Sequence, residues 1–285
     1  MENNMFVITP METEVSLSSG ETFTGTVTVA NPSAATSDFS FVVNVSPYYV
    51  AGESYNIDLT NSSDRSQIVN WITLDETRGT LKPNESKKIS FTINVPIDAP
   101  AGAQYAAISV TQDKAATGSV GANIENVFEI THVIYANIAG EAVNHQAEIL
   151  ENSIPGFTVT TPVTLSALVN NEGDVHERVI TEIAVKNAIT GEQILPTAEN
   201  HGQQSELILP DTTRKIERQI SDLPAVGVVN ITQTVYYNGK VSTETKNLII
   251  FPIWLMLIIL IFLAGITFLI IRKIRGVKNK GLDLH

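Results

Sequence analysis

The sequence of 285 residues contains no cysteine. Disulfide bonds are therefore excluded, and every folded domain must be stabilised by its hydrophobic core alone. The 248 residues that precede the last apolar run provide enough chain for two domains of ordinary size.

The motifs of common enzymes and metal sites are also missing. The five histidines include no pair spaced four residues apart and no HExxH motif, and there is no Gly-x-Ser-x-Gly elbow or phosphate-binding glycine loop. His132 lies in an apolar stretch, which predicts a packed or edge histidine, whereas His176-Glu177 follows a turn, which predicts solvent exposure. Asn171-Glu172-Gly173-Asp174 lacks the spacing of a calcium loop, so we interpret it as an ordinary turn. We expect no catalytic residues, no metal and no cofactor, and therefore no enzyme.

Positive charge is scarce outside the C-terminus. The chain has 18 Lys and Arg against 30 Asp and Glu, a net charge of -12. Five of the basic residues and one acid follow Ile271, so the first 248 residues carry 13 basic and 29 acidic groups, a net charge of -16. Such a domain repels phosphate, which argues against nucleic acid as a partner.

The dominant feature that is present is an apolar run of 23 residues, Ile249–Ile271, without a charged side chain. As a helix it reaches about 35 Å, enough to cross a bilayer core of about 30 Å. Trp254 suits the interfacial aromatic belt at one end, and Arg272, Lys273 and Arg275 lead a basic flank at the other. The positive-inside rule places that flank in the cytoplasm. The run therefore predicts a single-pass membrane helix whose N-terminal side is extracellular.

The N-terminus does not fit this orientation by itself. Residues 1–5, MENNM, provide neither a basic segment nor an apolar segment, so they are not a signal peptide. We hypothesise that a signal peptide has been removed from the sequence or lies upstream of it. An exported chain without cysteine is more typical of Gram-positive-type bacteria than of animal receptors.

The residues before the apolar run read as β-strands throughout. Alternating patterns rich in Val and Thr occur at Thr22–Ala30, Asp38–Val45, Lys88–Val95 and Gln104–Thr111, and turn residues separate them. Trp71 is predicted to be a core residue. The second half repeats the pattern at His145–Leu150, Phe157–Val169, Glu177–Lys186, Arg214–Ile220 and Val226–Tyr237. Asn238-Gly239 then predicts a hairpin with Lys240–Leu248.

These patterns predict a mainly β fold, in which two tandem immunoglobulin-like antiparallel β-sandwiches are followed by one C-terminal transmembrane helix. We assign residues 1–140 to the N-terminal sandwich and 141–248 to a membrane-proximal sandwich. Residues 249–271 form the transmembrane helix, and 272–285 form the basic cytoplasmic tail. The Gly/Ala-rich stretch Lys114–Asn123 is predicted to be a hairpin loop before the long strand Ile124–Ala139.

The first half resembles a known family. LDETRGTLKPNESKKI, the strand FTINVP and DAPAGAQYAAISV, all within Leu74–Val110, are similar to the N-terminal domain of the WxL-interacting cell-surface proteins of Gram-positive bacteria. Ile8-Thr9-Pro10 and Thr131–Asn137 fit the same pattern, and the resemblance covers most of residues 6–140. Asn170–Lys186 and the turn LPDTTRKIE resemble a bacterial membrane-proximal immunoglobulin-like domain. The resemblance implies a first domain that binds peptidoglycan and a second that binds a partner surface protein.

Three tyrosines form the candidate binding site. Tyr48, Tyr49 and Tyr55 cluster near Gly52 in a loop that follows a predicted strand. Aromatic residues on a loop of a rigid sandwich often bind sugars or partners, although they could equally cover the end of the sandwich. Residues 209–213, LPDTT, resemble a sortase sorting signal, but the fifth residue is Thr and predicted strands separate the motif from the apolar run. We expect no cleavage there.

The sequence therefore predicts a single-pass protein of the bacterial cell surface that binds rather than catalyses. Our leading hypothesis is attachment to the cell wall, retention of a partner surface protein, or both. The alternative is a structural or chaperone-like sandwich subunit of a surface appendage, which pairs an exposed edge strand with a client.

Overall fold

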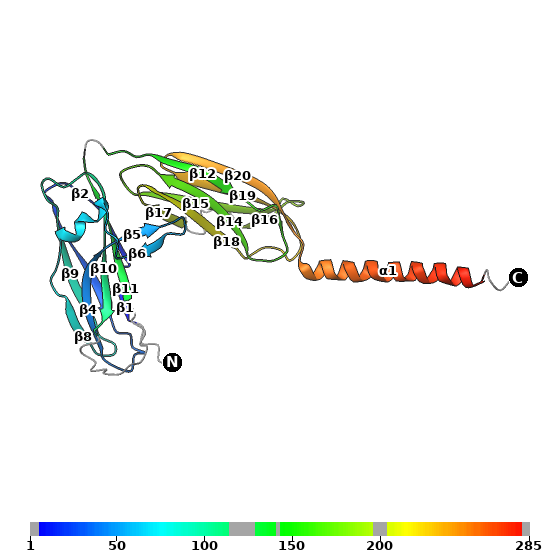
Figure 1. The fold of residues 1–285 in the computed structure, drawn as a ribbon, viewed down its shortest axis with the longest axis horizontal. Helices are drawn as coiled ribbons and strands as arrows, with labels where there is room; N and C mark the ends of the chain where they lie inside the picture. Colours follow the sequence, from blue (N-terminus) through cyan, green and yellow to red (C-terminus); the bar gives the residue numbers. More distant parts are fainter. Residues whose placement is uncertain (1–5, 114–128, 141–142, 196–203, 281–285) are drawn as a thin grey trace. The chain divides into compact units, whose positions relative to one another are not determined.

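A computed structural model describes residues 6–113, 129–140, 143–195 and 204–280. These residues form a mainly β chain that ends in one apolar helix, which confirms the predicted fold class (Figure 1). Contacts divide the chain into two compact units. The first contains Met1–Glu148, Asn170–Arg178 and Leu207–Arg214, and the second contains the remaining residues.

The described residues before residue 140 contain eleven strands. They are β1 (Val7–Thr9), β2 (Glu12–Leu17), β3 (Thr22–Ala30), β4 (Phe39–Pro47), β5 (Tyr49–Ala51), β6 (Asn56–Asp58), β7 (Ile72–Leu74), β8 (Arg78–Leu81), β9 (Ser86–Asn94), β10 (Gly102–Gln112) and β11 (Glu129–Ile138), with the 3₁₀-helix η1 (Asp64–Trp71) before β7. The later strands are β12 (Ala147–Ser153), β13 (Phe157–Thr158), β14 (Val163–Asn171), β15 (Glu177–Asn187), β16 (Gln193–Leu195), β17 (Gln204–Ile208), β18 (Thr212–Ile220), β19 (Gly227–Tyr237) and β20 (Lys240–Ile250), followed by helix α1 (Ile253–Lys280).

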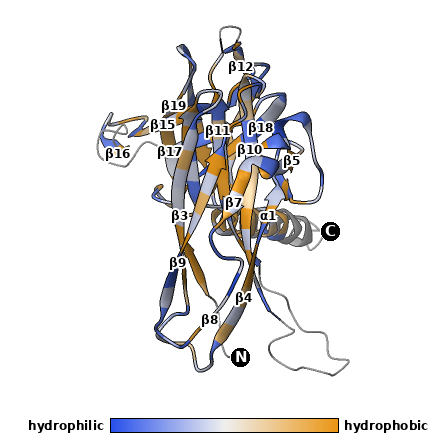
Figure 2. Ribbon diagram, turned by 90° about the vertical axis from the view of Figure 1, so that its left-hand side faces the viewer, coloured by the Kyte–Doolittle hydropathy of each residue, from blue (hydrophilic) through white to orange (hydrophobic). Residues whose placement is uncertain are grey.

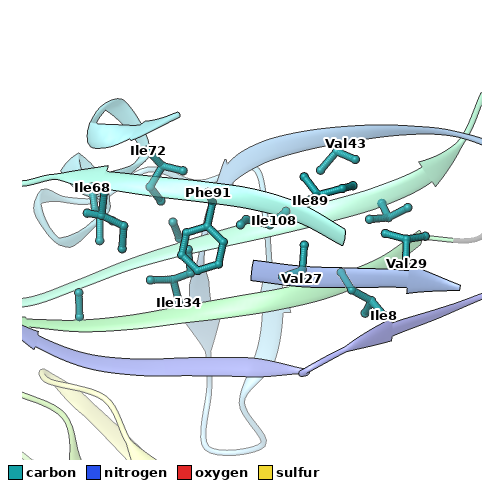
Figure 3. Packing of buried hydrophobic residues seen from close by; sticks show 14 of the residues in the cluster. Ile8, Val27, Val29, Val43, Ile68, Ile72, Ile89, Phe91, Ile108 and Ile134 are labelled. Carbon is teal, nitrogen blue, oxygen red and sulfur yellow. The ribbon is translucent and has the colours of Figure 1, made fainter. Parts of the chain in front are cut away.

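The sandwich of the first unit consists of two sheets, with strand orders β1-β3-β9-β7 and β2-β11-β10-β4-β8. Along β9, buried residues alternate with less buried ones, so the sheet that contains it presents one apolar face to the core (Figure 2 colours the strands by hydropathy). Phe91 of β9 packs in the core with Ile108 of β10 and Ile134 of β11, and none of the three is exposed (Figure 3). Strands β2 and β11 pair in parallel, so the sheet is mixed rather than purely antiparallel.

Strand β10 is buried on both of its faces, and this feature positions the candidate site. Its first nine residues, from Gly102 to Val110, are all buried. One set of side chains, including Ile108, faces the core between the sheets. The alternate set, including Tyr105, belongs to a second apolar cluster with Tyr48, Tyr135 and Leu209. The first unit therefore has an additional hydrophobic layer outside the sandwich core.

The second unit contains most of the sheets β12-β14-β18 and β13-β20-β19-β15-β16, with β17 paired to β15. Its core includes Leu165, Val185, Ile231 and Leu248, none of which is exposed. The predicted hairpin at Asn238-Gly239 is confirmed. Both residues have positive φ angles, of 45° and 73°, because a type I′ turn requires that conformation at both central positions.

Helix α1 contains the predicted membrane segment, with a different start. Ile249 and Ile250 complete strand β20, so the helix begins at Ile253 rather than at residue 249. The segment Ile253–Lys273 is long and apolar enough to cross a membrane. Trp254 lies in the first turn with half of its surface exposed. Arg272 and Lys273 are exposed near the end of the apolar segment, and Arg275 belongs to the same helix.

One element of the fold was not expected from the sequence. The helix η1 was not predicted, because Asp64–Trp71 shows no 3.6-residue apolar period; Trp71 at its end is partly buried against the core. The compact units include Asn170–Arg178 and Leu207–Arg214 in the first unit. The domain bounds 1–140 and 141–248 stay a prediction. The predicted loop Lys114–Asn123, the beginning of the strand Ile124–Ala139 and the end of the cytoplasmic tail lie outside the described residues.

Candidate functional site

A pocket of about 290 Å³ lies in the first unit, over the outer face of β10. Four segments line it: residues 48–50, residues 63–65, Tyr105 and residues 209–212. They come from the start of β5, the start of η1, the middle of β10 and the turn between β17 and β18. The tyrosine pocket, as we name this site, combines aromatic rings with charged groups of both signs.

Arg65 supplies the positive charge of the tyrosine pocket. Ser63 caps η1 and accepts a hydrogen bond from the Arg65 backbone N–H, which fixes the backbone of the arginine. The guanidinium Nε and Nη2 both donate to one carboxylate oxygen of Asp211, at 3.2 and 2.8 Å. Nη1 donates to the backbone carbonyl of Asp174 at 3.0 Å. Three links therefore hold the arginine, whose side chain is 24% exposed.

Tyr105 supplies a buried hydroxyl. The residue is 3% exposed, and its hydroxyl has no hydrogen-bond partner among the described residues. Burial raises the pKa of Tyr105 well above its usual value, so the phenol stays protonated at neutral pH. Its ring packs edge-on against Tyr135, with ring centroids 5.9 Å apart. Because buried polar groups are normally paired, this hydroxyl is suited to a partner that enters the pocket.

The three tyrosines predicted from the sequence are found in one region but in different roles. Tyr48 and Tyr49 both line the pocket. Tyr48 is buried with its ring edge-on to Tyr135, and burial raises the pKa of its phenol. Tyr49 is 41% exposed, so it is the aromatic ring that a partner can reach first. Tyr55 does not line the pocket but supports one of its walls.

That wall is the turn formed by residues 209–212. The Tyr55 hydroxyl accepts a hydrogen bond from the Leu209 backbone N–H at 2.9 Å and also bonds the Thr212 hydroxyl. The Arg214 guanidinium lies over the Tyr55 ring, 4.4 Å from its centroid. Burial raises the pKa of Tyr55, which keeps the hydroxyl available as a donor to Thr212. The sortase-like sequence is therefore a folded, hydrogen-bonded turn.

His176 lies close to the pocket's aromatic cluster, and the predicted solvent exposure of this residue is wrong. It is 4% exposed, and its ring packs against the rings of Tyr105 and Tyr135. Its Nε2 atom lies 3.3 Å from a carboxylate oxygen of Glu14. Burial nevertheless lowers the pKa of His176, because desolvation of the charged ring outweighs the attraction of Glu14.

The remaining sequence candidates have structural roles. His132 is fully buried on β11, with Nδ1 2.9 Å from the Pro10 carbonyl, which confirms a packed histidine. Burial lowers its pKa. Asn171 is buried, and its carboxamide oxygen accepts from the Gly173 N–H at 2.9 Å, as in an ordinary turn. Among the described residues, no group of three or more His, Asp or Glu side chains is placed to hold a metal ion.

Sequence reasoning did not find Arg65, Tyr105 or Asp211 as site residues. Tyr105 lies in a strand with an ordinary core pattern, and Arg65 lies in a segment without periodicity. Asp211 was visible only as part of the sortase-like motif. The three residues are 40 or more positions apart in sequence, and no local signal connects them.

No family model matches this chain, and no curated protein matches it. Several solved structures are similar over most of their length. The class 5 fimbriae chaperone CfaA is 12% identical, with 85% of this chain and 99% of that chain covered and a TM-score of 0.41. The CsuC–CsuE chaperone–tip adhesion subunit complex of Acinetobacter baumannii is 14% identical, with coverages of 86% and 98% and a TM-score of 0.39. The E. coli chaperone DraB is 12% identical, with coverages of 85% and 96% and a TM-score of 0.38.

Proposed function

We propose that this chain is a membrane-anchored binding protein whose first unit retains a protein partner at the tyrosine pocket. The proposal rests on the composition of the pocket. It contains the Arg65 guanidinium, which Asp211 fixes by hydrogen bonds, the exposed ring of Tyr49 and the buried Tyr105 hydroxyl, which has no hydrogen-bond partner among the described residues. Tyrosine and arginine are the residues that most often dominate the binding energy of protein interfaces. At about 290 Å³ the pocket is at the small end of ligand sites and suits one anchoring side chain of a partner.

The chemistry of the pocket favours binding over catalysis. Its carboxylate nearest to the arginine, Asp211, is occupied by the ion pair with Arg65. The Thr212 hydroxyl donates to the Leu209 carbonyl at 2.6 Å, so it is engaged in the turn rather than presented to a base. An activated nucleophile requires a base in hydrogen-bond contact, and in the described part of the chain no carboxylate or histidine is hydrogen-bonded to the Thr212 hydroxyl.

Helix α1 supports the membrane part of the proposal. Its segment Ile253–Lys273 is long and apolar enough to cross a membrane. The basic residues after it favour a cytoplasmic tail under the positive-inside rule, and we propose on this basis that both β units are extracellular. Attachment to peptidoglycan, the other half of the sequence-based hypothesis, rests on the family resemblance alone. The photo-crosslinking experiment described next also detects attachment to peptidoglycan.

Photo-crosslinking in the cells that produce the chain tests the proposal. Tyr49 is replaced by p-benzoyl-phenylalanine, and adducts are identified by mass spectrometry after irradiation. The matched control places the same group at Tyr236, which is 37% exposed and lies far from the pocket in sequence. A protein adduct at position 49 that is absent at position 236, and that is lost in the Arg65→Ala background, supports the proposal. An adduct that muramidase releases, or equal labelling at both positions, contradicts it.

A second candidate function, a chaperone-like subunit, is favoured by strand β2. This six-residue strand is at the edge of its sheet, and it bonds β11 through alternate residues, as in the Val133 N–H to Met11 carbonyl bond of 2.9 Å. The intervening backbone groups, including those of Ser16, face away from β11 and could pair with a client strand. Ser16→Pro removes one such donor. Loss of partner binding in Ser16→Pro, with binding retained in Arg65→Ala, favours the chaperone-like function over the pocket.

A further inference from the structure

The outer face of the β19–β20 hairpin has polar pairs in its middle rows and less polar pairs at its two ends, Tyr236–Val241 and Val228–Ile249. Along most of the β19–β20 hairpin this face consists of polar cross-strand pairs. These are Thr234–Thr243 at 3.3 Å, Thr232–Thr245 at 3.0 Å and Asn230–Asn247 at 2.9 Å. Such pairs suit a surface that is in contact with water.

The next pair on the same face is apolar. Ile249 of β20 is paired with Val228 on one side and with Phe157 of β13 on the other. Ile249 is 46% exposed, Phe157 is 53% exposed, and Val226, directly before β19, is 47% exposed. Paired residues in a sheet share a face, so Ile249 and Phe157 continue the polar rows as an exposed apolar pair. Val226 adds an exposed apolar side chain directly before β19. We name Phe157, Val226 and Ile249 the apolar foot.

The apolar foot lies directly beside the start of the membrane helix. The Phe251 N–H still bonds the Thr158 carbonyl at 3.0 Å, so the sheet continues one residue past Ile250. The Leu255 and Met256 N–H groups then bond the Pro252 carbonyl at 3.0 and 3.3 Å, so the helix follows at once. Ile249 and Ile253 are four residues apart, which limits their separation to about 14 Å. This apolar group is therefore close to the depth at which the lipid core begins.

We propose that the apolar foot enters the interfacial layer of a phospholipid bilayer next to the start of α1. The inference rests on the proposed membrane anchoring and adds a second, sheet-borne contact to the helix. Exposed Phe, Val and Ile side chains gain free energy when they leave water, and the helix holds them where lipid is available. The next pair on this face, Asn230–Asn247, is polar and therefore stays outside the lipid. The contact restrains rotation of the second unit about the helix axis.

Spin labelling tests the inference on the full chain in phosphatidylcholine–phosphatidylglycerol vesicles. The chain has no cysteine, so Ile249→Cys, Val241→Cys and Ile261→Cys each carry a single nitroxide. Val241 is 60% exposed at the other end of β20, and Ile261 is 70% exposed in the middle of the apolar segment. Electron paramagnetic resonance compares collisions of the label with oxygen, which enters lipid, and with a water-soluble nickel complex.

We expect the ratio of oxygen to nickel collisions to be severalfold higher at position 249 than at position 241, and highest at position 261. Equal ratios at 249 and 241, with position 261 shielded from nickel, overturn the apolar foot and leave the anchor in place. Free access of nickel to position 261 would show that α1 does not cross the bilayer. That result would contradict both the proposed membrane anchoring and the insertion of the apolar foot.

Discussion

Gly25 lies directly opposite Phe91 across the β3–β9 pair, with the tip of the phenylalanine ring over the glycine. A Cβ atom at position 25 would lie only 2.3 Å from the ring Cζ. The second sheet of the same sandwich repeats the relationship, because Phe41 lies opposite Gly79 with a corresponding distance of 2.6 Å. In each sheet the glycine has no side chain, and the ring of a core phenylalanine on the neighbouring strand occupies that space.

The first prediction follows from that packing. Gly25→Ala should lower the free energy of unfolding by about 1–3 kcal/mol, because the ring must move out of a filled core to admit the methyl group. Urea unfolding of the variant measures the loss. Gly156→Ala is the control, since its Cβ would meet only the Lys246 side chain at 3.5 Å, and it should change stability by about 0.5 kcal/mol or less. Equal effects of the two variants would contradict the packing argument.

Tyr105 and Tyr55 should respond in opposite ways to the loss of their hydroxyls. Tyr105→Phe removes an unpartnered buried group, so stability should stay the same or rise by up to about 1 kcal/mol, while crosslinking at position 49 falls. Tyr55→Phe removes the acceptor of the Leu209 N–H and a partner of Thr212, so it should cost about 1–2 kcal/mol. Thermal and urea unfolding compare the two. A destabilised Tyr105→Phe would show that the hydroxyl has a structural partner.

The Arg65–Asp211 pair should show measurable coupling. A double-mutant cycle with Arg65→Met and Asp211→Asn is expected to give about 0.5–1 kcal/mol, because both bonds go to one carboxylate but Asp211 is largely exposed. Asparagine is chosen because Asp211 has a positive φ of 58°, which asparagine tolerates. The Lys215–Glu217 pair, in which both side chains are about half exposed, is the control and should give coupling near zero. Equal coupling in both cycles would show that burial of Arg65 adds nothing.

His176 should make the protein less stable in mild acid. Its pKa is lowered in the folded state, so below the unfolded value of about 6.5 the unfolded chain binds the proton first. Stability attributable to this group is therefore complete above pH of about 6.5 and is lost as the pH falls towards the folded pKa, by at most about 1.4 kcal/mol per pH unit. Proton NMR of the His176 ring gives the folded pKa directly. A midpoint at or above 6.5 would contradict the expectation.

A matched change separates the two influences on His176. Glu14→Gln removes the opposing charge that raises the pKa, so the midpoint should move further down. His132 also has a lowered pKa caused by burial, but Pro10 rather than Glu14 is its hydrogen-bond partner. Its midpoint should shift less than that of His176 in the Glu14→Gln variant.

The strands were predictable because alternation and turn chemistry are local. Strand β3 has the predicted bounds Thr22–Ala30, and the Asn238-Gly239 hairpin follows from two residues. The apolar run Ile249–Ile271 begins four residues before α1, since an apolar run alone does not distinguish the end of a strand from a helix. His176 was misjudged because its burial depends on Tyr105 and Tyr135, which lie far away in sequence.

The candidate site was predictable only in part for the same reason. Adjacent Tyr48 and Tyr49 indicated an aromatic loop, but the guanidinium and the buried hydroxyl that complete the pocket come from other segments. Their meeting depends on the tertiary packing of η1, β10 and the turn at 209–212, which no spacing in the sequence reveals.

Strand β20 connects to helix α1 through Phe251 and Pro252 alone, so the two behave as one continuous element under load. A pull on the helix along the direction of the strand stresses every hydrogen bond of the eleven-residue β19–β20 ladder together, instead of opening them one after another. Because the sequence contains no cysteine, hydrogen bonds and side-chain packing alone resist such a pull. In the membrane-anchored protein that we propose, β20 is then the element through which force passes from the helix into the second unit.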